Sequence, residues 1–283
     1  MRYNSAMDLT NINDLKLAMQ LAGLRAQKGL GQHFLVDRDS LEAVITAGEL
    51  VPTDHVIEIG PGLGVMTAPL TERVAQVTAV EMDTRLADLL QQDKPDNLTV
   101  LNQDVMQLDL RSLPPQYKVI ANIPYYLTSA IIRLFLEAPQ PPQIMSLLIQ
   151  KEVAERIVAK PGKMSVLAFS VQYYGAARLV QVVEHFKFWP APKVDSAILQ
   201  VKVYDAPLFA ADRDALFRLV KAGFGEKRKQ MKNSLAGGLN ISMELAAELI
   251  AKAKLAETAR AQELSMAEWE RLYQVAMAAK LLA

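Results

Sequence analysis

Apolar positions in the first two thirds of the chain form an alternation of short runs and amphipathic stretches. Short apolar runs predict strands, and apolar residues three or four positions apart predict helices. The expected strands are 55–60, 76–83, 98–104, 117–123 and 143–150. The expected helices are 13–24, 40–50, a glycine-led helix through about 75, 84–92, 129–137, 151–160 and 166–174. This alternation predicts an α/β fold, a mostly parallel sheet covered by helices on both faces.

The pattern changes at the end of this region. Segments 177–184 and 193–203 both resemble strands, and a proline-rich turn at 188–192 joins them. Two strands with so short a link are expected to pair antiparallel and to end the sheet in a hairpin. A dehydrogenase-type sheet stays parallel to its edge, whereas one reversed strand near the end is typical of methyltransferases.

From about residue 204 onward the pattern predicts helices alone. The expected helices are 213–224, 243–255 and 266–282, with a break at Gly237-Gly238. This shift marks a domain boundary. The chain is therefore expected to contain an N-terminal extension (1–27), an α/β domain (28–203) and a small all-α domain (204–283).

Composition indicates a soluble cytoplasmic protein. Hydrophobic residues make up 51% of the 283 positions and charged residues 22%, so a large core can be buried. The chain has no cysteine, and its three histidines are scattered, so no metal site is expected. The sequence also lacks an apolar run of the roughly 18 residues that a membrane span needs, and its N-terminus lacks a signal-peptide core.

A glycine-rich loop, Glu58-Ile-Gly60-Pro-Gly62-Leu-Gly64, follows the first predicted strand of the sheet. Glycines there allow a sharp turn and the close approach of a ligand. A pyrophosphate-binding loop would have its third glycine at position 65, where Val65 stands, and no P-loop lysine follows. An amino-acid moiety fits this loop at least as well as a diphosphate.

Acidic residues end the next two strands. Glu81 ends the second strand, where a carboxylate can accept hydrogen bonds from both ribose hydroxyls of a nucleoside. Asp104 ends the third and is placed to accept a hydrogen bond from the exocyclic amine of an adenine. Either acid alone could be a helix cap or a surface carboxylate. With the glycine loop they indicate an adenosine-bearing cofactor, without separating NAD from S-adenosylmethionine.

Asn122-Ile-Pro124-Tyr125 ends the fourth strand, beside the same crevice. An exocyclic amine is a poor nucleophile, and hydrogen bonds from it to the Asn122 oxygen and a nearby backbone carbonyl would aim its lone pair at a methyl group. Pro124 stiffens the loop, and Tyr125 offers a ring for base stacking. The alternative is a rigid turn with Tyr125 in the core. Phe188 either closes the pocket or packs against the neighbouring prolines.

Basic residues gather near the start of the second domain. The formal net charge is zero, so local charge matters more than the total. Such a cluster either neutralises phosphates or forms an ordinary solvated helix face. Its members are Lys221, Lys227, Arg228, Lys229 and Lys232.

Read in order, these motifs resemble the KsgA family of ribosomal RNA adenine dimethyltransferases from about residue 28 to 282. The matching stretches are 31–35 (GQHFL), 58–64, Glu81, 103–104, 122–125, 150–156 and 188–196. The resemblance implies a Rossmann-like class I methyltransferase that binds S-adenosylmethionine, releases S-adenosylhomocysteine and uses no metal. The residues implied in cofactor binding are His33, Leu35, Gly60, Gly62, Glu81, Asp104 and Asn122.

The resemblance also implies a reaction and a partner. Asn122 and Tyr125 would hold the target adenine, and the family adds two methyl groups to each of two adjacent adenosines near the 3′ end of 16S rRNA in the small ribosomal subunit. A monomer that contacts no membrane is expected. Two positions depart from the family pattern: His33 stands where bacterial members more often have Asn, and Tyr126 where many relatives have Asn.

The second domain separates the related alternatives. Residues 224–235 resemble the F-x-x-[RK]-R-K-x-x-x-N-x-L helix of the KsgA group, which favours Lys227, Arg228, Lys229 and Lys232 as RNA contacts. The sister family of erythromycin-resistance methyltransferases, which modify 23S rRNA, shares the catalytic motifs. A non-catalytic ribosome-assembly factor with a vestigial pocket is a second alternative. An NAD-linked oxidoreductase is a third alternative, but the chain lacks the third glycine of a dinucleotide-binding loop and has no His, Lys or Tyr-x-x-x-Lys acid near the crevice.

Overall fold

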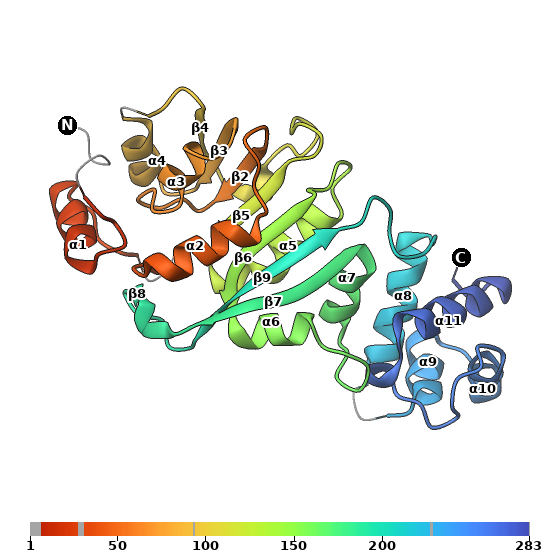
Figure 1. Ribbon diagram of the computed structural model, residues 1–283. Helices are drawn as coiled ribbons and strands as arrows, with labels where there is room; N and C mark the ends of the chain where they lie inside the picture. Colours follow the sequence, from red (N-terminus) through yellow and green to blue (C-terminus); the bar gives the residue numbers. More distant parts are fainter. Residues whose placement is uncertain (1–6, 28–30, 93, 227–228, 283) are drawn as a thin grey trace. The chain divides into compact units, whose positions relative to one another are not determined.

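The computed structural model describes residues 7–27, 31–92, 94–226 and 229–282 (Figure 1). Contacts divide these residues into two compact units. The first unit contains the described residues up to 154 together with 176–203, and the second contains 155–175 and the described residues from 204 onward. Residues 155–175, which the sequence analysis grouped with the first domain, thus pack with the C-terminal residues.

A seven-stranded sheet forms the centre of the first unit. Its strands are β2 (His55–Ile59), β3 (Gln76–Glu81), β4 (Leu98–Asn102), β5 (Lys118–Asn122), β6 (Ile144–Gln150), β7 (Gly175–Val183) and β9 (Ser196–Val203). Their order is β4-β3-β2-β5-β6-β9-β7. All pairs from β4 through β6 are parallel, and β9 runs antiparallel to β6. The predicted mostly parallel sheet with a reversed strand near its end is confirmed.

The sheet order determines where a ligand can bind. From β2 the chain proceeds to β3 and β4 on one side, and then returns to place β5 on the other side of β2. Open α/β sheets bind ligands at such a switch point, outside the carboxyl ends of the strands. The strand tips at Ile59, Glu81, Asn102 and Asn122 all lie at this edge.

The first unit contains six α-helices or parts of α-helices among its described residues, and α2 illustrates how they are capped and packed. They are α1 (Ile12–Leu21), α2 (Arg38–Ala47), α3 (Thr67–Thr71), α4 (Thr84–Gln91), α5 (Thr128–Leu136) and the start of α6 (Lys151–Ile157). Helix α2 begins before the expected residue 40 because Asp37, rather than Asp39 or Ser40, caps it by accepting a hydrogen bond from the Ser40 N–H. Its buried Val44 packs in one apolar cluster with Ile120 and Leu148 of the sheet.

Helix α3 is shorter than expected. The sequence predicted a helix from the glycine loop through about residue 75, but α3 covers five residues. Gly62 and Gly64 have φ angles of +60° and +85°, which lie outside the right-handed helical region, so the helix begins only at Thr67. The loop before it consequently stays open at the strand edge.

A second, two-stranded sheet was missed in the sequence. Strand β1 (Phe34–Leu35) pairs antiparallel with β8 (Phe188–Trp189). The expected simple turn between the last two strands therefore contains β8 and, before it, a single 3-10 turn at His185–Lys187. This pairing brings the Gly31–Leu35 motif into contact with the Phe188–Ser196 motif, and the His33 ring donates from Nδ1 to the Pro190 carbonyl at 2.6 Å.

The regular elements in the described part of the second unit are helices. Its helices are α7 (Val166–Tyr174), α8 (Arg213–Phe224), α9 (Met231–Leu239), α10 (Met243–Lys252) and α11 (Met266–Ala278). They share one core around Phe169, Tyr173 and the fully buried Trp269. The expected break at Gly237-Gly238 is wrong, because both glycines lie inside α9. Packing explains one of them: a Cβ on Gly238 would lie 2.6 Å from Ala222 of α8.

Candidate active site

A pocket opens at the carboxyl ends of β2, β3, β4 and β5 in the first unit. It is lined by residues of the glycine loop, of the strand tips and of the segment before β1. Eight of its lining residues have a role predicted from the sequence, and these are His33, Leu35, Gly60, Gly62, Glu81, Asp104, Asn122 and Pro124. Lining residues without a role predicted from the sequence include Gln32, Met82, Gln103, Val105 and Tyr126.

Two glycines shape the floor of this pocket. Gly60 has a φ of +65° while its N–H donates to the Val80 carbonyl, so the chain turns sharply just after β2. Gly62 has a φ of +60°, and a Cβ there would lie 2.9 Å from the ring of Phe34. Any side chain at either position would be strained, and at Gly62 it would also collide. The backbone is therefore bare where a ligand would approach it.

Glu81 is the carboxylate of the pocket. Its side chain is 7% exposed, and burial raises its pKa. Two backbone donors oppose that rise: the Gly62 N–H bonds to Oε2 at 3.1 Å, and the Asp83 N–H bonds to Oε1 at 2.8 Å. Each carboxylate oxygen can accept more than one hydrogen bond, so a fixed acceptor pair still faces the pocket. This arrangement suits the two hydroxyls of a ribose.

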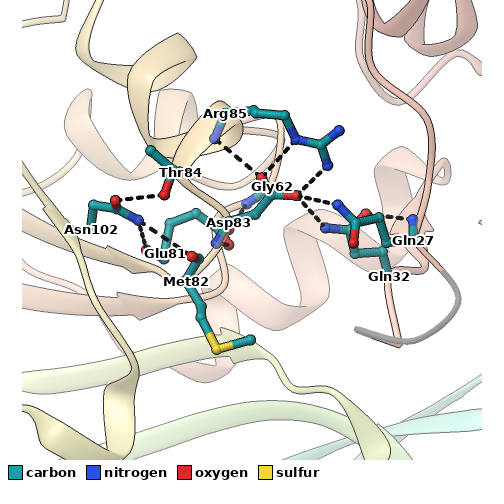
Figure 2. A network of polar contacts seen from close by, with 9 residues as sticks. All are labelled: Gln27, Gln32, Gly62, Glu81, Met82, Asp83, Thr84, Arg85 and Asn102. Carbon is teal, nitrogen blue, oxygen red and sulfur yellow. Dashed lines mark hydrogen bonds and ion pairs between the residues drawn. The ribbon is translucent and has the colours of Figure 1, made fainter.

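A polar network surrounds Glu81 (Figure 2). Asp83 caps α4 and accepts two side-chain hydrogen bonds from Arg85, which lower the pKa of its carboxyl. Its Oδ2 also accepts hydrogen bonds from the side-chain amides of Gln27 at 3.2 Å and Gln32 at 3.4 Å. On the other side, Asn102 donates to the Glu81 carbonyl at 2.9 Å. The β3 tip is thus tied both to β4 and to the N-terminal segment.

Asp104 and Gln103 follow β4 and line the pocket. Asp104 caps a single 3-10 turn by accepting a hydrogen bond from the Met106 N–H at 2.9 Å through Oδ1. The capping alternative considered for this acid is therefore present in the structure. Capping occupies one oxygen and leaves the other as an acceptor, so Asp104 can perform both tasks.

Asn122 sits at the tip of β5 with its amide orientation fixed. Its Nδ2 donates to the His33 carbonyl at 2.8 Å, which leaves Oδ1 as the acceptor. The His33 carbonyl comes from the segment that β1 and β8 hold in place. A hydrogen bond across 89 residues of sequence therefore orients the one side-chain amide oxygen expected to meet an amine.

The two tyrosines after Pro124 have different environments. The Tyr125 hydroxyl is 2.8 Å from Ser196 Oγ, its ring stacks on His33 with centroids 6.0 Å apart, and it is not among the residues that line the pocket. Tyr126 does line the pocket and is 61% exposed. Base stacking by Tyr125 stays a prediction, and Tyr126 was missed because adjacent tyrosines cannot be told apart by pattern. Phe188 is buried at 3% exposure, in agreement with a packing role.

The predicted RNA contacts lie in the second unit, apart from this pocket in sequence. Lys227 and Arg228 fall outside the described residues. Lys229 pairs with Glu226 at 2.7 Å and Lys232 with Glu257 at 3.0 Å. Surface ion pairs of this kind are worth at most about 1 kcal/mol, so a phosphate could compete for either lysine. Their role in binding RNA stays a prediction.

The sheet order with its reversed β9, and a pocket at the strand tips lined by the glycine-rich loop and Glu81, define the class of the protein. It is a class I S-adenosylmethionine-dependent methyltransferase fold, and the predicted fold class is confirmed. A crystal structure of a dimethyladenosine transferase from Plasmodium falciparum has a TM-score of 0.75 at 23% identity, over 85% of this chain and 96% of that one. This similarity supports the fold.

Comparisons of sequence resolve the class into a family. The model of the family described as ribosomal RNA adenine dimethylase matches residues 23–277. Proteins named ribosomal RNA small subunit methyltransferase A are 43% identical in Dehalococcoides mccartyi, over 88% of both chains, and 39% identical in Alkaliphilus metalliredigens, over 88% of this chain and 91% of that protein. The chain belongs to the ribosomal RNA adenine dimethylase family. The predicted resemblance and the predicted enzyme class, a methyltransferase dependent on S-adenosylmethionine, are confirmed.

Another solved structure is a 23S rRNA methyltransferase, the kind of enzyme that the sequence left open as an alternative. The 23S rRNA methyltransferase ErmE has a TM-score of 0.70 at 29% identity, over 86% of this chain and 98% of that one. The chain is thus similar to both sister groups, with higher identity to the small-subunit relatives.

Proposed function

We propose that this enzyme transfers methyl groups to the N6 amines of two adjacent adenosines near the 3′ end of 16S rRNA, within the small ribosomal subunit or its precursor. The product is N6,N6-dimethyladenosine. The observation that supports this choice of substrate is the identity of 39–43% to proteins named ribosomal RNA small subunit methyltransferase A, which extends through the helical second unit. Family membership by itself specifies only an adenine of ribosomal RNA.

The residues of the pocket fit S-adenosylmethionine. Glu81 supplies acceptors for the ribose, and the backbone at Gly60 and at Gly62, which carry no side chain, accommodates the amino-acid part. Asp104, beside Val105, offers an oxygen to the adenine amine. When bound, the cofactor supplies an electrophilic methyl group on a sulfonium and leaves as S-adenosylhomocysteine, a neutral thioether. Because the sulfonium already makes the methyl group electrophilic, we propose a reaction without a metal ion.

Asn122 carries the proposed chemistry. Because Asn122 Nδ2 donates a hydrogen bond to the His33 carbonyl, Oδ1 can accept a hydrogen bond from an N–H of the target amine. This interaction draws the lone pair of the amine nitrogen out of conjugation with the adenine ring. Pro124 holds the following loop, and Tyr125 and Tyr126 are the aromatic residues available to the base. Nitrogen becomes acidic once alkylated, so its proton leaves without a strong general base. A base stacked in a helix cannot reach the pocket, so the target adenine is expected to be flipped out.

Two further proposals concern the setting of the reaction. Small-subunit rRNA is made and assembled in the cytoplasm of bacteria, so we place the enzyme there. We also propose that it acts as a monomer. Over the residues that the structure describes, none of the helices has the length and apolar character needed to cross a membrane.

The proposal is tested with isolated ribosomal subunits that lack the modification. Purified protein and S-adenosylmethionine are incubated with small or large subunits, and the rRNA nucleosides are then analysed by mass spectrometry. We expect N6,N6-dimethyladenosine in small-subunit rRNA alone. Methylation of large subunits instead would support a resistance-type enzyme. Failure to bind S-adenosylmethionine in a calorimetric titration would support the non-catalytic assembly factor.

The same assay tests the role of Asn122. We expect Asn122→Ala to lower methyl transfer by at least about a hundredfold, because the amine loses the acceptor that orients it. The variant should keep its unfolding temperature within a few degrees and still bind S-adenosylhomocysteine. An active Asn122→Ala enzyme would remove this residue from the mechanism.

A further inference from the structure

Helix α1 lies before the region that matches the family, which begins at residue 23. It is amphipathic, and the two faces differ sharply in exposure. Leu15 and Met19 are 0% and 3% exposed, whereas Leu17 and Leu21 are 44% and 58% exposed. A helix with one fully buried face is part of the packed structure of the first unit, and its contacts can be traced.

The buried face of α1 packs against the wall of the pocket. Leu15, Met19 and Leu24 form one apolar cluster with Phe34, Leu63 and Leu86. Phe34 and Leu86 line the pocket, and Leu63 stands between two glycines of the glycine-rich loop. The ring of Phe34 lies where it would meet a Cβ on Gly62 at 2.9 Å. The helix therefore supports the cofactor pocket from outside through side chains that form its wall.

A second, polar link joins the same N-terminal segment to the pocket (Figure 2). Gln27 donates from its side chain to Asp83 Oδ2 at 3.2 Å, and its backbone N–H donates to Gln32 Oε1 at 2.8 Å. Gln32, which lines the pocket, donates to the same Asp83 oxygen. The Asp83 N–H in turn donates to Glu81. One chain of hydrogen bonds thus runs from residue 27 to the carboxylate expected to hold the ribose.

We propose that α1 and Gln27 form a positioning element for the cofactor site, which holds Phe34, the glycine-rich loop and Glu81 in the geometry that binds S-adenosylmethionine. This inference rests on the proposed function, because it takes the pocket to be the cofactor site. Ordering side chains and loops on binding costs conformational entropy. Because the element fixes these side chains and the loop before the cofactor binds, less entropy is lost on binding and the affinity is higher. Among the described residues, the apolar cluster and the hydrogen bonds that connect this element to the pocket include neither Asn122 nor Tyr126, so we expect it to act on the cofactor rather than on the methyl acceptor.

The two faces of α1 provide a matched test. Leu15→Ala with Met19→Ala removes the packing, and Leu17→Ala with Leu21→Ala truncates two apolar side chains of similar size on the exposed face. The dissociation constant for S-adenosylhomocysteine is measured by calorimetry, together with KM for S-adenosylmethionine and kcat at saturating cofactor. We expect the buried-face variant to bind at least about tenfold more weakly, with a raised KM and an unchanged kcat. The exposed-face variant should match the unaltered enzyme.

Gln27→Ala tests the polar link without opening a cavity, since this residue is exposed. We expect a dissociation constant several-fold higher and an unfolding temperature close to that of the unaltered enzyme. This variant decides the question if the buried-face variant does not fold. Unchanged affinity in Gln27→Ala, or a loss of kcat without a change in affinity, would overturn the inference. If the unaltered enzyme did not bind S-adenosylhomocysteine, the proposed function would fail instead.

Discussion

Glu58 is a fully buried acid two residues before Gly60, the first glycine of the glycine-rich loop. Its Oε2 accepts a hydrogen bond from Thr67 Oγ1 at 2.6 Å, while Oε1 has no partner among the described residues. Burial raises the pKa of this carboxyl to about 8. Near neutral pH the folded protein therefore holds a proton here that the unfolded chain, with its ordinary pKa of 4.5, has lost.

This difference predicts a pH dependence of stability. The contribution of Glu58 is fully present below about pH 4.5 and is lost as the pH rises through 8, because only the unfolded chain ionises freely in that window. The free energy of unfolding should decline with a slope of up to about 1.4 kcal/mol per pH unit from this group. Glu58→Gln imitates the protonated form and should lose that slope.

The measurement is urea unfolding of both proteins between pH 5 and pH 8. We expect the advantage of Glu58→Gln over the unaltered enzyme to increase with pH across this interval. Glu72→Gln, which changes an exposed glutamate, is the matched control and should follow the unaltered enzyme. Parallel pH profiles for Glu58→Gln and the unaltered enzyme would show that Glu58 is ionised in the folded state.

Tyr126 is the exposed aromatic residue at the edge of the pocket. Stacking of one base on an aromatic ring contributes about 1–3 kcal/mol. Tyr126→Ala should therefore raise KM for the RNA substrate by about fivefold or more, whereas Tyr126→Phe should stay near the unaltered value and the affinity for S-adenosylhomocysteine should not change. Phe186→Ala, at a 67% exposed ring that does not line the pocket, is the control. Equal KM values for all three variants would assign no base to Tyr126.

Sequence predicted the residues that approach the ligand through their place at strand tips. The carboxyl ends of adjacent parallel strands converge, so Glu81, Asp104 and Asn122 could be brought together without a structure. The side-chain directions of Tyr125 and Tyr126 could not be predicted, because they depend on partners as distant as Ser196. The same holds for the hydrogen bond from Asn122 to the His33 carbonyl.

At the scale of elements, strands with continuous apolar runs were found, since burial on both faces of a parallel sheet requires such runs. Strands β1 and β8 were missed because each has two residues and is defined only by pairing with a segment over 150 positions away. Gly237-Gly238 was interpreted as a break from local propensity, whereas tertiary packing of α9 on α8 decides its conformation. The sequence pattern thus predicted the strands whose own apolar runs identify them, and it missed the features that depend on pairing or packing with distant segments.

The two glycines of α9 give an element-scale prediction. A Cβ on Gly237 meets nothing within 4 Å, whereas one on Gly238 would lie 2.6 Å from Ala222. Gly237→Ala should stabilise the protein by about 0.5–1 kcal/mol, since alanine loses less conformational entropy in a helix. Gly238→Ala should destabilise it, because α9 must move away from α8. Urea unfolding measures both, and destabilisation by Gly237→Ala would contradict this account of the helix.

At the scale of the molecule, the chain has 31 basic and 31 acidic residues and no net charge to attract RNA. Affinity for a ribosomal subunit must then come from local charge, and the segment from Lys227 to Lys229 concentrates three basic residues in a row. Each phosphate contact releases counterions, so the number of contacts sets the salt dependence of binding. A segment that contacts phosphates and one that is merely solvated should therefore give different salt dependences of binding.

Replacement of Lys227, Arg228 and Lys229 by Gln should weaken binding to small subunits and reduce the slope of log K against log salt by about two to three, as expected for three lost phosphate contacts. The control is a triple variant that removes the same charge elsewhere in the second unit, by replacing Lys252, Lys254 and Lys280 with Gln. It should leave the slope nearly unchanged. Binding is measured at several salt concentrations with S-adenosylhomocysteine present, so that the pocket is equally filled in all variants. Equal slopes for the two triple variants would mean that only total charge matters, and the segment from Lys227 to Lys229 would then be a solvated face.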